Sequence, residues 1–294
     1  MALAIARGLH RCRTGASVLV ALVAVASAPA AARAAPGDEN ERRASALLLL
    51  ERPTRLAAES IVGEYVVRWR APARVISARP DRVLIDLGDA LGILRPSPDP
   101  VAVWVTDKAV RATWQWAPAA AVSRRHRAHL QIEVRSPRGD GVANARRLTH
   151  LVGAVIAAQN VLAVLWTDAG MLLSPAKFLA DTEAIGRDGI PTGLWLNILP
   201  AALSPHLPVM HTMGLSPLGF RELILFGHRA NPEQALDTLM QIAERVLQSR
   251  LTLRRGDTFR TNDRQTLVVE EIPAPWNTEE VALQLSPRPS GRRR

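Results

Sequence analysis

The sequence has almost no cysteine and almost no lysine. Its single cysteine, Cys12, lies near the amino terminus. The chain after it therefore has no thiol to form a disulfide, to bind a metal or to act as a nucleophile. Lys108 and Lys177 are the only lysines, so nearly all the positive charge is carried by arginine. Any chemistry must use other side chains.

Phosphate-binding and zinc-binding motifs are also absent. Neither G-x-x-x-x-G-K nor G-x-G-x-x-G occurs in the chain, so no nucleotide-binding loop is predicted. H-E-x-x-H does not occur, and the seven histidines are scattered. The closest pair, His126 and His129, lies among Arg124, Arg125 and Arg127, whose charge would repel a cation. The sequence predicts no cofactor and no metal site.

The excess of positive charge is concentrated at the two ends of the chain. Lys and Arg total 37 against 27 Asp and Glu. Residues 1–34 hold four arginines and no acid, and residues 287–294 hold four more and no acid, which leaves the middle close to neutral. Since no basic stripe with interleaved aromatic residues occurs there, binding to nucleic acid is disfavoured.

The first 34 residues are typical of an export signal. A positive segment precedes an apolar stretch from Ala16 to Ala28, and Ala32-Arg33-Ala34 is a small-residue cleavage site. The stretch is shorter than the roughly 20 residues that a spanning helix needs, so no membrane span is predicted in the mature chain. A periplasmic or secreted protein is expected; the alternative is a misassigned start codon and a cytoplasmic protein. A native first residue near Ala35 supports export, and one near Ser45 excludes it.

The rest of the chain is predicted to be one folded domain. Residues 35–44 are charged and predict a linker, residues 45–286 the domain, and residues 287–294 a basic disordered tail. A chain of 294 residues that is 48% hydrophobic can bury a core without disulfides or metals. Residues 46–50 are apolar at every position, as in a central strand covered on both faces.

Strands outnumber helices in the predicted order of elements. Apolar spacing of three and four residues predicts a helix over Gly141–Ala158, Ser174 followed by Pro175 begins one ending at Ala184, and Asn231 with Pro232 begins another. Further strands are predicted at 74–78, 83–87, 91–94, 129–134, 161–166, 194–199, 209–213, 223–226, 267–269 and 281–283. This order predicts an α+β fold: a mixed, mostly antiparallel sheet with three or four packed helices, and two related halves as a variant.

Four polar side chains are candidates for an unrecognised hydrolase site: His211, Glu222, Asp168 and His129. His211 and Glu222 flank Gly214-Leu215-Ser216-Pro217-Leu218-Gly219, whose spacing differs from the G-x-S-x-G of a nucleophile elbow. The simpler interpretation is a tight loop joining two strands. The hydrolase hypothesis uses side chains from this set, and their convergence on one concave pocket would favour it.

Tryptophan supplies most of the candidate binding residues. Trp104, Trp114 and Trp116 can form a recognition surface, because tryptophan is enriched at interface hot spots; packing in a core is the simpler alternative. Trp166 ends a predicted buried strand and Asp168 follows it, where clefts often form, although Asp168 can equally cap a turn. The full set of candidate binding residues is Trp104, Trp114, Trp116, Trp166, Asp168, Ser174 and Gly214.

Four segments together carry a resemblance to a known family. They are residues 46–53, residues 126–130, the stretch from Val164 to Pro175, and the stretch from His211 to Glu222. Over about residues 45–285 the chain resembles a bacterial family of domains of unknown function, DUF 4261. The resemblance implies a shared fold and brings no activity, cofactor or partner with it.

Absent catalytic motifs, a near-neutral middle and several tryptophans favour one class of function. We expect a non-enzymatic protein-interaction module, of the partner-binding or immunity type, whose protein partner the sequence does not identify. The alternative is a hydrolase-like enzyme that uses the His, Glu and Asp candidates named above.

Overall fold

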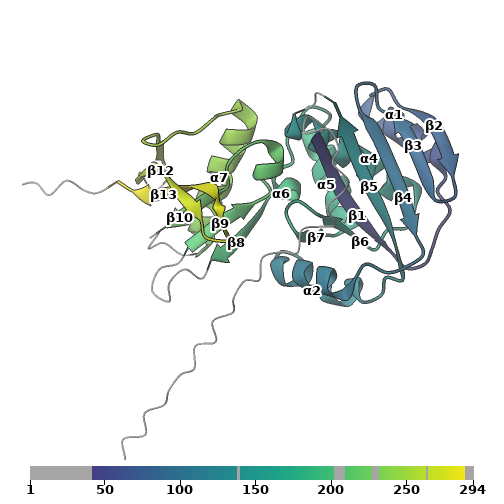
Figure 1. The fold of residues 1–294 in the computed structure, drawn as a ribbon, viewed down its shortest axis with the longest axis horizontal. Helices are drawn as coiled ribbons and strands as arrows, with labels where there is room; N and C mark the ends of the chain where they lie inside the picture. The colour runs from purple at the N-terminus through teal and green to yellow at the C-terminus, as the bar shows by residue number, and fades with distance from the viewer. Residues whose placement is uncertain (1–41, 138–139, 202–208, 227–231, 263, 289–294) are drawn as a thin grey trace, which may run out of the picture. The chain divides into compact units, whose positions relative to one another are not determined.

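The computed structural model describes residues 42–137, 140–201, 209–226, 232–262 and 264–288. These residues form seven helices and thirteen strands in two mostly antiparallel sheets (Figure 1), which confirms the predicted α+β class. The predicted leader, Cys12, Asn231 and most of the predicted linker and basic tail lie outside the described residues. Within the described ranges, no helix has both the length and the apolar character needed to cross a membrane.

The first sheet has the order β2-β3-β4-β5-β1-β6-β7, and all its neighbouring strands are antiparallel. Its strands are β1 (Arg42–Leu50), β2 (Arg74–Arg79), β3 (Arg82–Asp86), β4 (Leu91–Ser97), β5 (Ala128–Ser136), β6 (Ala163–Trp166) and β7 (Met171–Leu173). β1 begins three residues before the predicted domain start at Ser45 and lies between β5 and β6. Leu48 faces one core and Leu49 another, so both faces of this strand are buried, as predicted.

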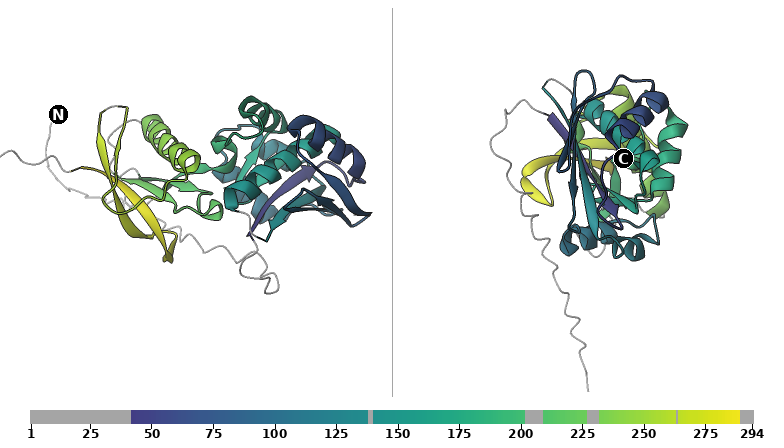
Figure 2. Two further views of the ribbon diagram at one scale, coloured as in Figure 1. Left: turned by 90° about the horizontal axis from the view of Figure 1, so that it is seen from above. Right: turned by 90° about the vertical axis from the view of Figure 1, so that its right-hand side faces the viewer.

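Helices cover both faces of the first sheet. The helices α1 (Ala58–Trp69), α4 (Gly141–Ala158) and α5 (Pro175–Ile185) share the larger core with Leu48. The helices α2 (Val103–Ala112) and α3 (Ala119–Ser123) share a smaller core with Leu49. In the right-hand view of Figure 2 the first sheet is seen nearly edge-on, with helices packed along it.

The second sheet has the order β11-β12-β13-β10-β9-β8, in which β10 and β13 are parallel. Its strands are β8 (Asn197–Ala201), β9 (Val209–Met213), β10 (Leu223–Phe226), β11 (Thr258–Arg260), β12 (Thr266–Ala274) and β13 (Asn277–Pro287). The helix α7 (Pro232–Ser249) buries Leu239, Ala243 and Leu247 in the same core as Leu223 and Leu285 of this sheet. α4, α5 and α7 begin where the sequence predicted.

Close contacts join α4 to the second sheet's connections. A Cβ on Gly141 would lie 2.3 Å from the carbonyl oxygen of Pro217 in the short helix η1 (Ser216–Leu218), so the first residue of α4 must be glycine. Trp195 of α6 (Thr192–Trp195) donates from Nε1 to Thr149 Oγ1 over 2.7 Å. The strand predicted over residues 194–199 begins only at Asn197, because the preceding turn is helical and buries Trp195.

Candidate functional site

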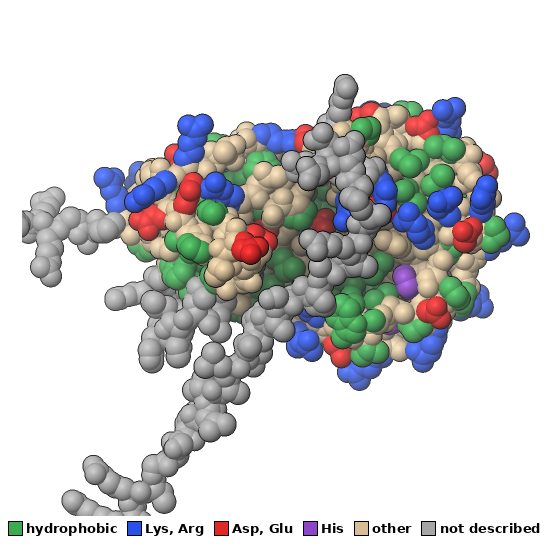
Figure 3. All heavy atoms as spheres, viewed as in Figure 1, with side chains coloured by type: hydrophobic (Ala, Val, Ile, Leu, Met, Phe, Trp, Pro, Cys, Tyr) green, Lys and Arg blue, Asp and Glu red, His purple; other side chains and the backbone are tan. Residues whose placement is uncertain are grey.

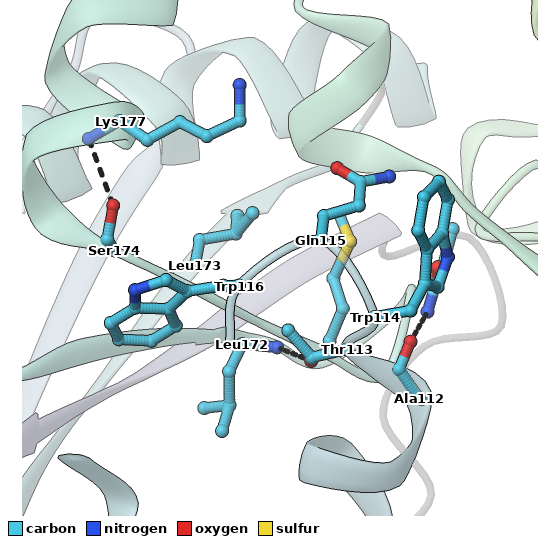
Figure 4. A pocket seen from close by; sticks show the side chains of 11 residues that line it. Ala112, Thr113, Trp114, Gln115, Trp116, Leu172, Leu173, Ser174 and Lys177 are labelled. Carbon is cyan, nitrogen blue, oxygen red and sulfur yellow. Dashed lines mark hydrogen bonds between the residues drawn. The ribbon is translucent and has the colours of Figure 1, made fainter. Parts of the chain in front are cut away.

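A small pocket lies beside Trp114 and Trp116 (Figure 4). The connection after α2 forms one wall, and β7 with the start of α5 forms the other. The two indole rings stand on opposite sides, with the side chain of Gln115 between them. The pocket encloses about 40 Å³, well below the roughly 300 Å³ at which small-molecule sites begin. It has room for the tip of one apolar side chain.

Hydrogen bonds fix the connection that carries these rings. Thr113 Oγ1 accepts from the backbone N–H of Leu172 over 2.8 Å and donates to the Ala109 carbonyl over 2.7 Å. Trp114 donates from Nε1 to the carbonyl of Ile198 in β8 over 3.2 Å. Its polar edge is therefore anchored while 53% of the residue stays exposed. The ring is held in place before any partner arrives.

Trp116 and Ser174 complete the pocket. Trp116 is half-buried and packs against the smaller core under α2 and α3. Ser174 accepts from the Lys177 backbone N–H over 3.2 Å, which caps α5, while the Lys177 side chain pairs with Asp181 over 2.6 Å. Three of the predicted binding residues, Trp114, Trp116 and Ser174, thus meet at one pocket.

Trp104 extends this surface along α2. It is 61% exposed and its neighbour Val103 is 70% exposed, although both begin a helix whose other side is buried. Helical spacing places Trp104 on the solvent face with Asp107, Lys108 and Arg111. Figure 3 shows hydrophobic side chains gathered over α2, with Lys and Arg side chains beside them. We call Val103, Trp104, Trp114 and Trp116 the tryptophan surface.

The remaining predicted binding residues lie elsewhere. Trp166 is 1% exposed and packs on Phe178 with ring centroids 6.2 Å apart, so it belongs to the larger core. Gly214 has φ of 122°, and a Cβ there would lie 2.4 Å from the carbonyl oxygen of Trp195. Asp168 is half-buried; burial raises its pKa to about 6, and Arg43 opposes the rise. None of the three lines the pocket beside the tryptophans.

His211 lies in β9, and Glu222 directly precedes β10. Glu222 is buried and accepts from Thr212 Oγ1 at 2.7 Å, Gly214 N at 3.0 Å and Ser216 N at 2.9 Å. Burial raises its pKa, and those hydrogen bonds oppose the rise. His211 stacks on Trp276 with centroids 4.6 Å apart, and burial lowers its pKa. Glu222 holds the loop after β9, as the tight-loop interpretation of that segment requires.

The other two catalytic candidates lie in the first sheet. His129 of β5 shares a 2.7 Å hydrogen bond with the Asp99 carbonyl through Nδ1, and Asp168 follows β6. The described hydrogen bonds and ring contacts of His129, His211 and Glu222 thus go to different partners. Over the described ranges no cluster of three His, Cys, Asp or Glu side chains could hold a metal ion, and His126 accepts from Val101 N over 3.0 Å.

Sequence reasoning missed a larger pocket on the other side of the first sheet. It encloses about 270 Å³ and is lined by Tyr65, Leu87, Asp89, Arg146, Arg147, His150, Arg187 and Asp188, among others. One signal could have revealed it: His150 lies four residues after Arg146 and three after Arg147 in the predicted helix 141–158, so its side chain neighbours each of theirs.

No family model matches the chain, and no curated protein is similar to it in sequence. The resemblance to the domain family of unknown function therefore stays a prediction.

Proposed function

We propose that this protein is a non-enzymatic interaction module that binds a protein partner through the tryptophan surface. The observation that carries the proposal is the exposure of Trp104 and Trp114, each more than half open to solvent, beside a pocket that fits one side-chain tip. Tryptophans held rigidly at a surface bury large area at little entropic cost when a partner docks. This supports the class of function favoured by the sequence over the hydrolase alternative.

The charges between the two tryptophans restrict the partner. Asp107, Lys108 and Arg111 lie on the exposed face of α2, so this face carries a net positive charge. A complementary partner has acidic residues between two apolar anchors, one of which enters the pocket between Trp114 and Trp116. Apolar anchoring supplies affinity, and the acidic stretch fixes orientation.

Affinity capture with matched variants tests the proposal. The tagged protein from residue 35 onward is used to capture partners from its native host, in parallel with Trp104→Ala, Trp114→Ala and Val67→Ala. Val67 is a matched control, because it is 77% exposed on α1 and outside the tryptophan surface. We expect one stoichiometric protein that wild type and Val67→Ala retain and both tryptophan variants lose.

The captured partner is then purified and its affinity measured by calorimetry against the same four proteins. Equal affinity for wild type and for the tryptophan variants would contradict the proposal, as would recovery of no partner at any ionic strength. Thermal melting of each variant ensures that a loss of binding reflects the surface and not unfolding.

A further inference from the structure

The larger pocket, which we call the basic pocket, combines three arginines with two buried aromatic donors. Tyr65 comes from α1, and Arg146, Arg147 and His150 come from α4. Arg187 and Asp188 follow α5, and Asp89 lies in the turn between β3 and β4. Its volume of about 270 Å³ approaches the size of known small-ligand sites.

Tyr65 and His150 are two further residues that line this pocket. They are 2% and 5% exposed, so most of each side chain is buried. The His150 ring stacks on Trp69, with centroids 4.5 Å apart and an interplanar angle of 10°. A phenol O–H and an imidazole N–H are hydrogen-bond donors, which suits a ligand with acceptor oxygens.

The protonation states of both groups suit an acceptor ligand. Burial raises the pKa of Tyr65 to about 12, and Arg147 and Arg187 oppose the rise, so the phenol keeps its proton. Burial lowers the pKa of His150 to about 4, helped by Arg146 and Arg187 and opposed by Asp188. At neutral pH the imidazole is uncharged and offers one N–H donor.

Two of the arginines lack a carboxylate partner in the described part of the chain. Arg146 donates from Nη2 to the Asp188 carbonyl over 3.1 Å, while its Nε is buried and has no partner. Arg187 donates to the Arg70 carbonyl over 3.3 Å. Only Arg147 is paired, to both oxygens of Asp89 at 2.6 Å. A buried guanidinium nitrogen without an acceptor is costly, and an anion bound beside Arg146 would offset part of that cost.

From this arrangement we propose that the basic pocket binds a small organic carboxylate. Three arginines against Asp89 and Asp188 leave one net positive charge, which a singly charged carboxylate neutralises and a phosphate dianion exceeds. The guanidinium fork of Arg146 matches the two oxygens of a carboxylate. Ala71, Pro72 and Leu87 give the pocket an apolar wall for the rest of the ligand.

Calorimetric titration of the full-length protein with benzoate tests this site, with inorganic phosphate as the second probe. We expect saturable benzoate binding that Arg146→Met weakens about 10-fold or more, since the variant keeps chain length and removes the charge. Tyr65→Phe, which removes one hydroxyl, should weaken it about 3-fold to 10-fold. Arg245→Met removes an exposed arginine from α7 and should change nothing.

Three outcomes would overturn the proposal: no saturable benzoate binding, equal weakening by Arg146→Met and Arg245→Met, or phosphate binding tighter than benzoate. Benzoate binding that is insensitive to Arg146→Met would also overturn the proposal, because it would show that benzoate binds without the arginine of the basic pocket. Trp114→Ala should leave benzoate binding intact, so failure of this proposal and failure of the tryptophan surface can be told apart.

Discussion

The two faces of the first sheet use aromatic residues in opposite ways. Under α1 and α4, Trp69 and Tyr65 are buried, and the arginines around them reach the pocket. On the face covered by α2, Trp104 and Trp114 point outward, and the helix keeps only small residues such as Thr106 and Ala109 buried. The same residue type thus stabilises the fold on one face and is available for recognition on the other.

This contrast shows that burial, and not residue type, decides what a substitution measures. A tryptophan that is buried and hydrogen-bonded reports on stability, and one that is exposed and anchored reports on binding.

The largest expected effect is a loss of stability on truncating the buried Trp69. Trp69→Ala removes a side chain that is 3% exposed, stacks on His150 and donates to the His150 carbonyl over 3.0 Å. It should lower the free energy of unfolding by about 3–5 kcal/mol. Trp104→Ala should change it by no more than about 0.5 kcal/mol. Urea denaturation of the two variants measures both changes. Similar losses of unfolding free energy in the two variants would contradict the difference between the buried and the exposed tryptophan.

The second effect concerns partner binding. Trp114→Ala should cost about 2 kcal/mol or more of binding free energy, roughly a 30-fold loss of affinity, as for a central hot spot. Trp114→Phe keeps an aromatic ring but loses the hydrogen bond to Ile198, and should lie between wild type and the alanine variant. Titration of the purified partner gives both values. Wild-type affinity of Trp114→Ala would show that Trp114 does not contribute to partner binding.

The third expected effect is on the pH dependence of stability, to which His150 and Asp168 contribute with opposite signs. His150, which faces Arg146, Arg147, Arg187 and Asp188, has a pKa of about 4 against 6.5 in an unfolded chain. The unfolded chain therefore binds the extra proton first, and stability falls as pH drops from 6.5 to 4. Asp168, with a pKa of about 6 against 3.8, adds stability over nearly the same range as pH falls.

Single variants should separate the contributions of these two residues to the change of stability with pH. Relative to wild type between pH 6.5 and pH 4.5, His150→Gln should gain stability on acidification and Asp168→Asn should lose it, each on the order of 2 kcal/mol. Urea midpoints at the two pH values give the comparison. Parallel curves for wild type and both variants would show that neither group is perturbed by burial.

The smallest effect is the response to salt. Raising sodium chloride from about 0.05 to 0.5 M should weaken benzoate binding in the basic pocket a few-fold, because screening acts on the arginine charges. Partner binding at the tryptophan surface should weaken less, since apolar burial provides most of its affinity. Calorimetry at the two salt concentrations compares them, and an equal response at both sites would contradict the proposed difference.

Local signals in the sequence predicted much of the fold. The apolar periodicity of residues 141–158 and the Ser174-Pro175 pair gave α4 and the start of α5, because spacing and caps act within one element. The helix α2 was not predicted, since its buried side consists of Thr106 and Ala109, which give no apolar stripe. The division into two sheets depends on long-range strand pairing, which no local pattern encodes.

The candidate sites were predicted less completely for the same reason. Trp114 and Trp116 were predicted together as part of a recognition surface and Ser174 separately as a helix cap, and the three share a pocket. The basic pocket joins Tyr65 to His150 from helices far apart in the chain, and the buried Arg146 Nε without a partner gives no signal in the sequence. Such a site is formed only by the folded chain.

The position of β13 has a consequence for how the protein is made. β13 is the last strand of the described chain, yet it lies between β12 and β10 inside the second sheet. During translation, β8, β9 and β10 therefore leave the ribosome well before the strand that joins them to β11 and β12 has been synthesised. Until then the apolar edge of β10, Leu223 to Phe226, remains open to pairing with other nascent chains. Translation that stops before β13 should yield a protein that aggregates, whereas the first sheet can already have formed.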